Sequence, residues 1–136
     1  MDTTKKIKSF VILETILLIS HLIFSFSLEQ SLPLSLQNYL HLQSQSEIST
    51  ADLVIIWGGI PVLLAYIVSV VGLLLTKVWA KNLYLFVSMA GYALAPFLGP
   101  TVEHAMSATI YDLGTLTGGV VLALLFFTRS SFDKSM

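Results

Sequence analysis

The sequence predicts an all-α fold, a polytopic membrane protein in which a four-transmembrane-helix bundle forms one membrane domain over residues 1–136. Hydrophobic residues make up 55% of the chain and charged residues only 11%, with a mean hydropathy of +0.83. Because a soluble domain typically carries about 25% charged residues, this composition excludes an ordinary soluble protein and a disordered chain. The apolar segments are continuous rather than alternating, which favours helices over a transmembrane barrel.

Four segments are each long and apolar enough to cross a bilayer, which takes about 20 helical residues for about 30 Å of hydrocarbon. The first, residues 7–28, follows a basic N-terminal stretch and has the form of a signal peptide. Glu14 and His21 interrupt its apolar centre, and its length suits a span, so we expect it to be retained rather than cleaved. The other spans are expected at residues 53–76, 79–98 and 109–128.

The first connection, the outer loop 29–52, is the long one. Four of its apolar residues share one helical face, so a short interfacial helix could lie on the outer membrane surface. A loosely ordered loop is the open alternative. Ser49, followed three residues later by Asp52, resembles a capping box for the second span. The four apolar residues are Leu32, Leu36, Tyr39 and Leu40.

Basic residues predict the orientation of the spans, because Lys and Arg are concentrated in cytoplasmic connections. The first and third connections, 29–52 and 99–108, contain none. In a four-span arrangement all the basic residues lie on one side, which puts both termini in the cytoplasm. Trp79 and Tyr84 are expected at the inner interface, where amphipathic rings prefer to lie. The basic residues are Lys5, Lys6, Lys8, Lys77, Lys81, Arg129 and Lys134.

Small residues four apart allow transmembrane helices to approach closely, and this approach drives their association in lipid. The last predicted span contains the pair Gly114 and Gly118, and the third contains Gly91, Ala95 and Gly99 in the same register. We expect these residues to pack the bundle internally. Contact with another membrane protein or a second copy is the alternative.

Three ionisable residues, Glu14, His21 and Asp112, form a candidate intramembrane polar site, because a charge at membrane depth is costly and often functional. Glu14 and His21 are seven residues apart and therefore lie on nearly the same helical face. If all three faced the bundle interior, they could pass a proton or coordinate a cation. The alternative is structural: Glu14 protonated and bonded across helices, His21 bonded to a carbonyl, and Asp112 solvated at headgroup depth.

Enzyme and cofactor motifs are absent from the sequence. The chain has no Cys, which excludes thiolate metal sites, and its three His residues lie in different segments without paired-ligand spacing. It contains no GxSxG, HExxH or phosphate-binding loop. We therefore expect no catalytic residue, no metal and no cofactor. The net charge of −1 also gives no basis for binding nucleic acid.

The stretch from Lys77 to Leu85, Lys-Val-Trp-Ala-Lys-Asn-Leu-Tyr-Leu, resembles the basic-Trp-small-basic-x-Leu-Tyr hairpin of small, uncharacterised four-span bacterial inner-membrane proteins. These proteins are of the domain-of-unknown-function type. The pair Gly99-Pro100 and the last span with Gly118 fit the same layout, so the resemblance covers about the last 80 residues. This chain has Lys where those proteins often have Arg. The resemblance implies a multi-pass location in the bacterial inner (plasma) membrane and no known activity.

Composition, topology and the lack of motifs favour a small integral inner-membrane protein with a non-catalytic accessory or interaction role. Its expected partners are the lipid bilayer and either another membrane protein or a second copy. A small oligomeric transporter, or a proton- or ion-conducting protein that uses Glu14, His21 and Asp112, is the alternative. An immunity-type protein that blocks a membrane-directed toxin is a further alternative.

Overall fold

The structure is a computed structural model that describes residues 3–45, 48–98, 102–128 and 132. Within these residues the chain is all-α and contains no strand, which confirms the all-α part of the predicted fold class but not the four-transmembrane-helix bundle. The elements are α1 (Thr3–Leu28), η1 (Glu29–Ser31), α2 (Leu34–Ser44), α3 (Thr50–Leu74), α4 (Val78–Leu94), η2 (Ala95–Leu98) and α5 (Ala105–Phe127).

Three helical segments are long and apolar enough to cross a membrane, namely Thr3–Ser31, Asp52–Leu74 and Ala105–Phe127. The third predicted span corresponds to α4, which has only 17 residues, fewer than the about 20 that a span needs. The chain continues beyond α4 as the 3₁₀ helix η2, which contains Pro96. A proline lacks the N–H that would extend the α-helical hydrogen bonds, which explains why α4 is shorter than the prediction.

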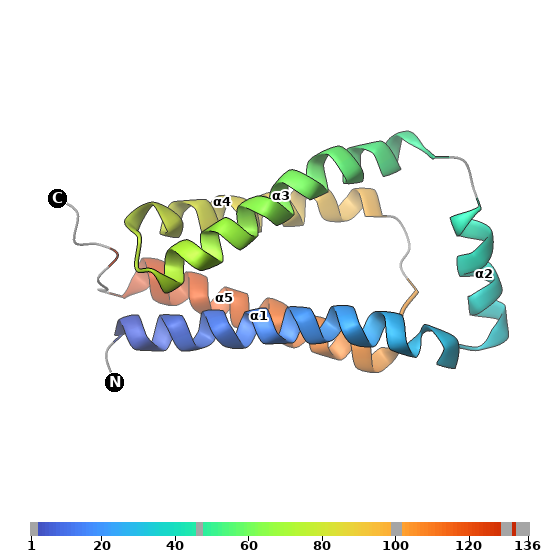
Figure 1. The fold of residues 1–136 in the computed structure, drawn as a ribbon, viewed down its shortest axis with the longest axis horizontal. Coiled ribbons are helices and arrows are strands. Elements are labelled where there is room, and N and C mark those ends of the chain that lie inside the picture. Colours follow the sequence, from blue (N-terminus) through green and yellow to red (C-terminus); the bar gives the residue numbers. More distant parts are fainter. Residues whose placement is uncertain (1–2, 46–47, 99–101, 129–131, 133–136) are drawn as a thin grey trace.

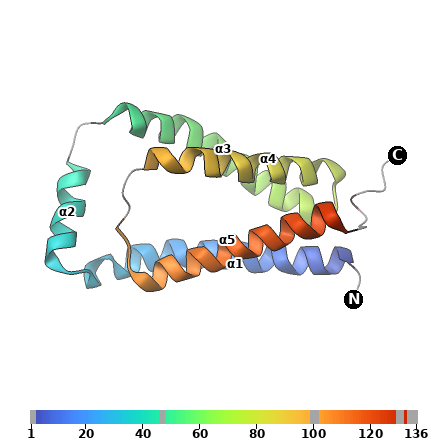
Figure 2. The same ribbon diagram turned by 180° about the vertical axis from the view of Figure 1, so that it is seen from behind.

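The helices form two antiparallel pairs, α1 with α5 and α3 with α4 (Figures 1 and 2). The pairs lie close together where α1 begins, α3 turns into α4 and α5 ends. We call this the lysine end, because Lys5, Lys6, Lys8, Lys77 and Lys81 lie there. The pairs diverge toward the opposite end, the α2 end, where α2 runs across and connects α1 to α3.

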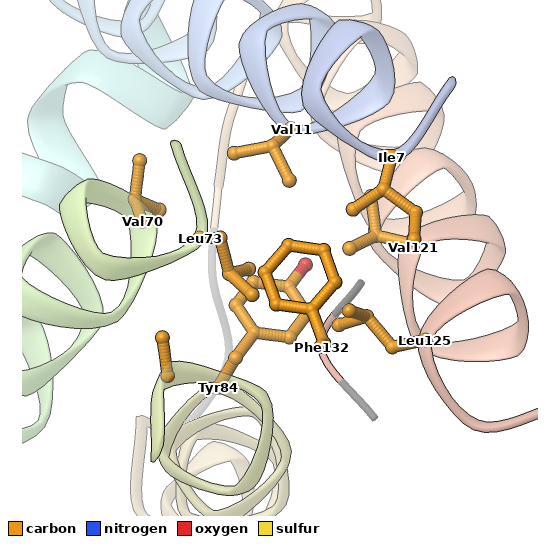
Figure 3. Packing of buried hydrophobic residues seen from close by; sticks show 9 residues of the cluster. Ile7, Val11, Val70, Leu73, Tyr84, Val121, Leu125 and Phe132 are labelled. Atoms are coloured by element: carbon orange, nitrogen blue, oxygen red, sulfur yellow. The ribbon is translucent and has the colours of Figure 1, made fainter. Parts of the chain in front are cut away.

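A hydrophobic core occupies the lysine end and draws on all four long helices (Figure 3). Toward the α2 end, no residue of α3 from Leu53 to Tyr66 is buried, and none of α4 from Ser88 to Leu94. The molecule therefore differs from a bundle that is compact along its whole length. The core consists of Ile7, Val11, Val70, Leu73, Ala80, Tyr84, Val121, Leu125 and Phe132.

A three-residue turn joins α3 to α4 and makes the short second connection a tight hairpin. Thr76 has a φ of 59°, in the left-handed region. Its N–H donates to the Leu73 carbonyl at 3.0 Å, and the Lys77 N–H donates to the Gly72 carbonyl at 2.8 Å, which is the Schellman pattern that closes a helix C-terminus. A Cβ added to Gly72 would lie 2.6 Å from the Cβ of Ala80, so the two helices approach closely here.

Two features of the predicted outer loop have defined structures. Ser49 and Asp52 form the predicted capping box of α3, because the Asp52 N–H donates to the Ser49 hydroxyl at 3.2 Å and the Ser49 N–H donates to the Asp52 carboxylate at 2.7 Å. Residues 34–44 form α2, so this part of the chain is a helix rather than a loosely ordered loop. It runs across the end of the molecule, between the end of α1 and the beginning of α3 (Figure 1).

Candidate functional site

Glu14 is the one buried carboxylate among the described residues, with a side chain only 6% exposed. It lies on the face of α1 that also carries the core residues Val11 and Ile7, about one turn and two turns closer to the lysine end, respectively. The hydroxyl of Tyr84, on α4, donates a hydrogen bond of 2.6 Å to Glu14 Oε2. A short bond of this kind fixes the carboxyl between α1 and α4.

Gly118, on α5, completes the surroundings of the Glu14 carboxyl. A Cβ at this position would lie 2.9 Å from Glu14 Oε1 and 3.3 Å from the Tyr84 hydroxyl. Any larger residue would therefore displace one of these groups. Gly114, one turn away on α5, faces Leu18 of α1 in the same manner, at 3.3 Å from its Cδ2. The glycine pair thus lies on the face of α5 that packs against α1.

Tyr66, on α3, adds a second phenol to the site. Its ring centroid lies 6.2 Å from that of Tyr84, and its hydroxyl is buried without a hydrogen bond to a described residue. The Glu14 carboxyl is close enough to act on this hydroxyl electrostatically. One carboxyl group and two phenol groups, from three helices, therefore meet at the boundary between the packed lysine end and the diverging halves of the pairs.

Within the described part of the chain, no lysine, arginine or histidine pairs with Glu14. A charged carboxylate without a cationic partner is costly to bury, and such a group commonly takes up a proton instead. The same residues contain no group of three His, Asp or Glu side chains that could hold a metal ion. The site therefore presents a single carboxyl group that is held by the phenol of Tyr84, with the phenol of Tyr66 nearby.

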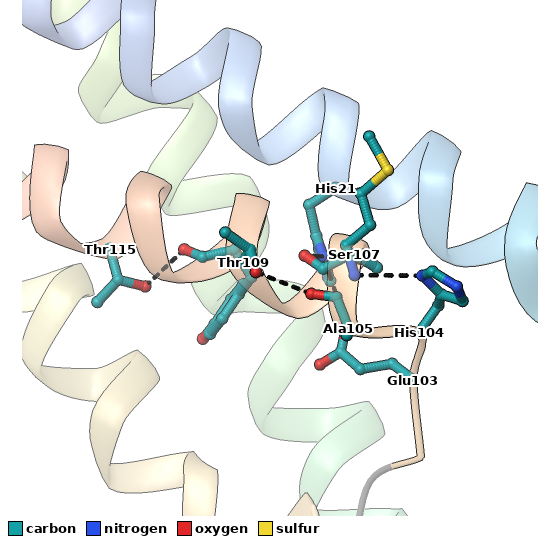
Figure 4. Close-up of polar contacts among 9 residues, drawn as sticks. His21, Glu103, His104, Ala105, Ser107, Thr109 and Thr115 are labelled. Atoms are coloured by element: carbon teal, nitrogen blue, oxygen red, sulfur yellow. Dashed lines mark hydrogen bonds and ion pairs between the residues drawn. The ribbon is translucent and has the colours of Figure 1, made fainter.

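His21 belongs to a separate cluster near the α2 end, which joins α1 to the beginning of α5 (Figure 4). Its Nδ1 lies 3.2 Å from the carbonyl oxygen and 3.1 Å from the hydroxyl of the buried Ser107. Glu103 Oε2 lies 3.7 Å from the same nitrogen. The rings of His21 and Tyr111 are tilted relative to each other, with their centroids 5.1 Å apart. The cluster fastens the two helices together on the side of Glu14 away from the lysines.

A polar hollow of about 150 Å³ lies beside this cluster. Its lining includes Glu29, Glu103 and His104. His104 is already engaged, because its Nδ1 accepts the Met106 N–H at 3.2 Å and so caps α5 (Figure 4). The hollow therefore gives water access to the neighbourhood of His21, whose side chain is 22% exposed.

Asp112 does not join either cluster. Its side chain is exposed, and among the described residues it forms no hydrogen bond or ion pair with Glu14 or His21. Thr115 and Thr117, which follow it, donate to carbonyl groups of their own helix at 3.1 Å and 2.7 Å. The three ionisable residues of the sequence prediction are thus divided between a buried site, a partly exposed site and the surface.

The remaining helix-packing candidates lie on α4 and beyond it. Gly91 has no described atom within 4 Å of the position that a Cβ would take, and Ala95 is exposed. Both continue the helical face that carries Ala80, Tyr84 and Val87 in the core, at spacings of three and four residues. Gly99 lies outside the described residues.

Sequence reasoning placed Tyr84 at the membrane interface, whereas the structure buries it to 1% exposure beside Glu14. Ala80, Tyr84 and Val87 are spaced at i, i+4 and i+7, and this spacing could have predicted that they share a buried face of α4. Tyr66 and Ser107 carried no comparable signal, because single hydroxyl groups are common in membrane helices.

Neither family models, nor curated proteins, nor solved structures match this chain. The resemblance of the hairpin from Lys77 to Leu85 therefore stays a prediction.

Proposed function

We propose that this chain is a small four-span protein of the bacterial inner membrane with a non-catalytic accessory role. In this proposal it holds a transmembrane helix of another membrane protein between the diverging halves of its two helix pairs. The observation that carries the proposal is the confinement of the buried core to the lysine end. A four-helix bundle that needed no partner would bury residues along the whole length of α3 and α4.

The combined length of α4 and η2 supports a fourth span. At 1.5 Å per α-helical residue, and about 2.0 Å per 3₁₀ residue, residues 78–98 reach about 33 Å. This length exceeds the about 30 Å of bilayer hydrocarbon, which α4 alone, at about 26 Å, does not reach. An even number of spans then follows.

The described lysines support an orientation with both termini in the cytoplasm. They cluster at the lysine end, whereas no Lys or Arg occurs between Leu83 and Tyr111, or between Ser9 and Thr76. Positive residues near the ends of spans favour the cytoplasmic side. The α2 end then faces the periplasm.

The uncovered face of α4 indicates what fits between the pairs. Gly91 and Ala95 continue the core face of α4, yet nothing fills the space beside Gly91. Small residues four apart permit the close backbone approach by which membrane helices associate. A flexible lipid chain gains little from such a surface, whereas an apolar helix packs well against it.

Photo-crosslinking tests the proposal in native membranes. A photoreactive amino acid at Ala95 should capture one defined membrane protein, whereas the same group at the exposed Ile16 of α1 should capture lipid. Gly91→Leu fills the uncovered face and should abolish the protein crosslink. Gly119→Leu is the matched control, because Gly119 also has no described atom within 4 Å but lies on α5.

Three results would overturn the proposal. The first is capture of lipid alone from both positions, and the second is a protein crosslink that survives Gly91→Leu. The third is a product at twice the mass of the chain, which would assign the face to a second copy. Circular dichroism of each variant ensures that a lost crosslink does not reflect a lost fold.

A further inference from the structure

The buried Glu14 is not required by a helix-binding role, and its position suggests a second property. It lies about 17 Å along α1 from Thr3, near the middle of a helix that is about 39 Å long. An ionisable group at this depth is costly to keep. The surroundings of the carboxyl group differ sharply on its two sides.

Toward the lysine end, a dry apolar layer closes the site. Ile7, Val11 and Leu73 are fully buried there, as are Val121 and Leu125 of α5. Apart from Tyr84, the one buried polar side chain on this side among the described residues is that of Ser69 on α3, whose hydroxyl donates to the Tyr66 carbonyl at 2.7 Å and is therefore satisfied within its own helix. Water and ions therefore have no polar path through it.

Phe132 completes the apolar layer, although it lies beyond α5 in sequence. Its side chain is 1% exposed, and its ring lies among Leu73, Tyr84 and Leu125 (Figure 3). An aromatic residue brought back into the core closes the space between the two helix pairs at the lysine end.

Toward the α2 end, no such layer exists. Beyond Glu14, no residue of α1 is buried, and the same holds for α3 on that side of Tyr66. On α4 the last buried residue is Val87, one turn beyond Tyr84, and the buried Gly114 and Ser107 of α5 face α1 rather than the space between the pairs. His21 lies two turns from Glu14 on nearly the same face of α1, next to Glu103 and the polar hollow. This side of the site therefore leads toward polar groups and water.

We infer that Glu14, together with Tyr84 and Tyr66, binds a single proton and exchanges it only with the side of the membrane at the α2 end. Phe132 and the apolar layer close the route from the lysine end. The titratable groups that face Glu14 are Tyr84 from α4 and Tyr66 from α3, whereas α5 presents Gly118. His21 is the next titratable group along α1. In the binding step an O–H bond of hydronium breaks and an O–H bond forms on the carboxylate, which leaves a neutral carboxylic acid and a water molecule.

Infrared spectroscopy of vesicles tests this inference directly. The purified full chain is reconstituted into phosphatidylcholine–phosphatidylglycerol vesicles, and the pH is raised on one side at a time. The C=O band of the protonated carboxylic acid is assigned to Glu14 by its loss in Glu14→Gln. Because the chain has no native cysteine, the orientation can be read from Ser35→Cys with an impermeant thiol reagent.

The Glu14 band should decrease only when the pH is raised on the α2 side. In Phe132→Ala it should respond from both sides. Phe127→Ala is the matched control, because Phe127 lies near the same end of α5 but is 89% exposed, and this variant should keep the one-sided response.

A wild-type response from both sides would overturn the inference, and so would a band that responds to neither side. An unchanged, one-sided response in Phe132→Ala, with the variant still folded by circular dichroism, would refute the closing role of Phe132. The inference does not depend on the partner helix, because the vesicles contain only this chain.

Discussion

Replacement of Gly118 by Ala tests the central geometry of the molecule, the meeting of α1, α4 and α5 at Glu14. The added Cβ would lie 2.9 Å from Glu14 Oε1, about 0.5 Å inside an ordinary contact of 3.4 Å. The carboxyl is the far end of a flexible side chain, so it should move rather than push α5 away. That movement lengthens or breaks the 2.6 Å bond from Tyr84.

The free energy of unfolding should fall by about 1 to 2 kcal/mol, which is the value of one buried hydrogen bond with a strongly polar partner. Gly119→Ala is the control, because it makes the same chemical change on the next residue of α5, where no described atom lies within 4 Å. Both variants gain the same helix propensity from the change of Gly to Ala. The difference between their free energies of unfolding therefore reports the contact with Glu14 alone.

Unfolding in mixed micelles with rising fractions of sodium dodecyl sulfate, followed by circular dichroism, measures this difference. Combining each glycine variant with Glu14→Ala completes a double-mutant cycle. Without the carboxyl group, Gly118→Ala and Gly119→Ala should agree within about 0.5 kcal/mol. Equal stabilities in the wild-type background, or a penalty that persists after Glu14 is removed, would refute this view of the site.

Three further variants test other parts of the fold. Thr76→Gly should raise the free energy of unfolding by about 1 kcal/mol in the same assay, because a β-branched residue at a φ of 59° is strained whereas glycine is not. A loss of stability in this variant would contradict the Schellman turn. Gly72→Ala should lower the free energy of unfolding by about 2 kcal/mol, because the added Cβ would lie 2.6 Å from the Cβ of Ala80, a short side chain that cannot move aside. A neutral effect would mean that α3 and α4 separate easily at this point. His21→Phe keeps a ring beside α5 but loses the hydrogen bonds to Ser107, so the free energy of unfolding should fall by about 1 kcal/mol. Backbone amides at the start of α5 should also exchange hydrogen faster. Unchanged exchange would contradict the role of this cluster in joining α1 to α5.

Local features of the sequence predicted the helices well. Each predicted span overlaps an α-helix. The capping box at Ser49 and Asp52 depends only on residues three apart. The largest difference concerns α4, where Pro96 ends the α-helical hydrogen bonds early. Hydropathy alone cannot show this, because the residues on both sides of the proline are apolar.

The sequence alone could not predict which helices pair with one another. Side chains that face lipid and side chains that face another helix are equally apolar, so composition does not separate them. The contact between Gly118 and Glu14 joins residues about 100 positions apart in the chain. Phe132 lies outside every span, and its burial depends on the arrangement of all the long helices around it.

The position of α2 has a consequence for the dimensions of the molecule. With 11 residues, α2 is about 17 Å long and lies across the space between the end of α1 and the beginning of α3. Axes of packed helices lie about 8–10 Å apart, so a helix between two others holds those two about 16–20 Å apart. If a helix of another membrane protein lies between the pairs, as we propose, the length of α2 suits the width of one such helix rather than two.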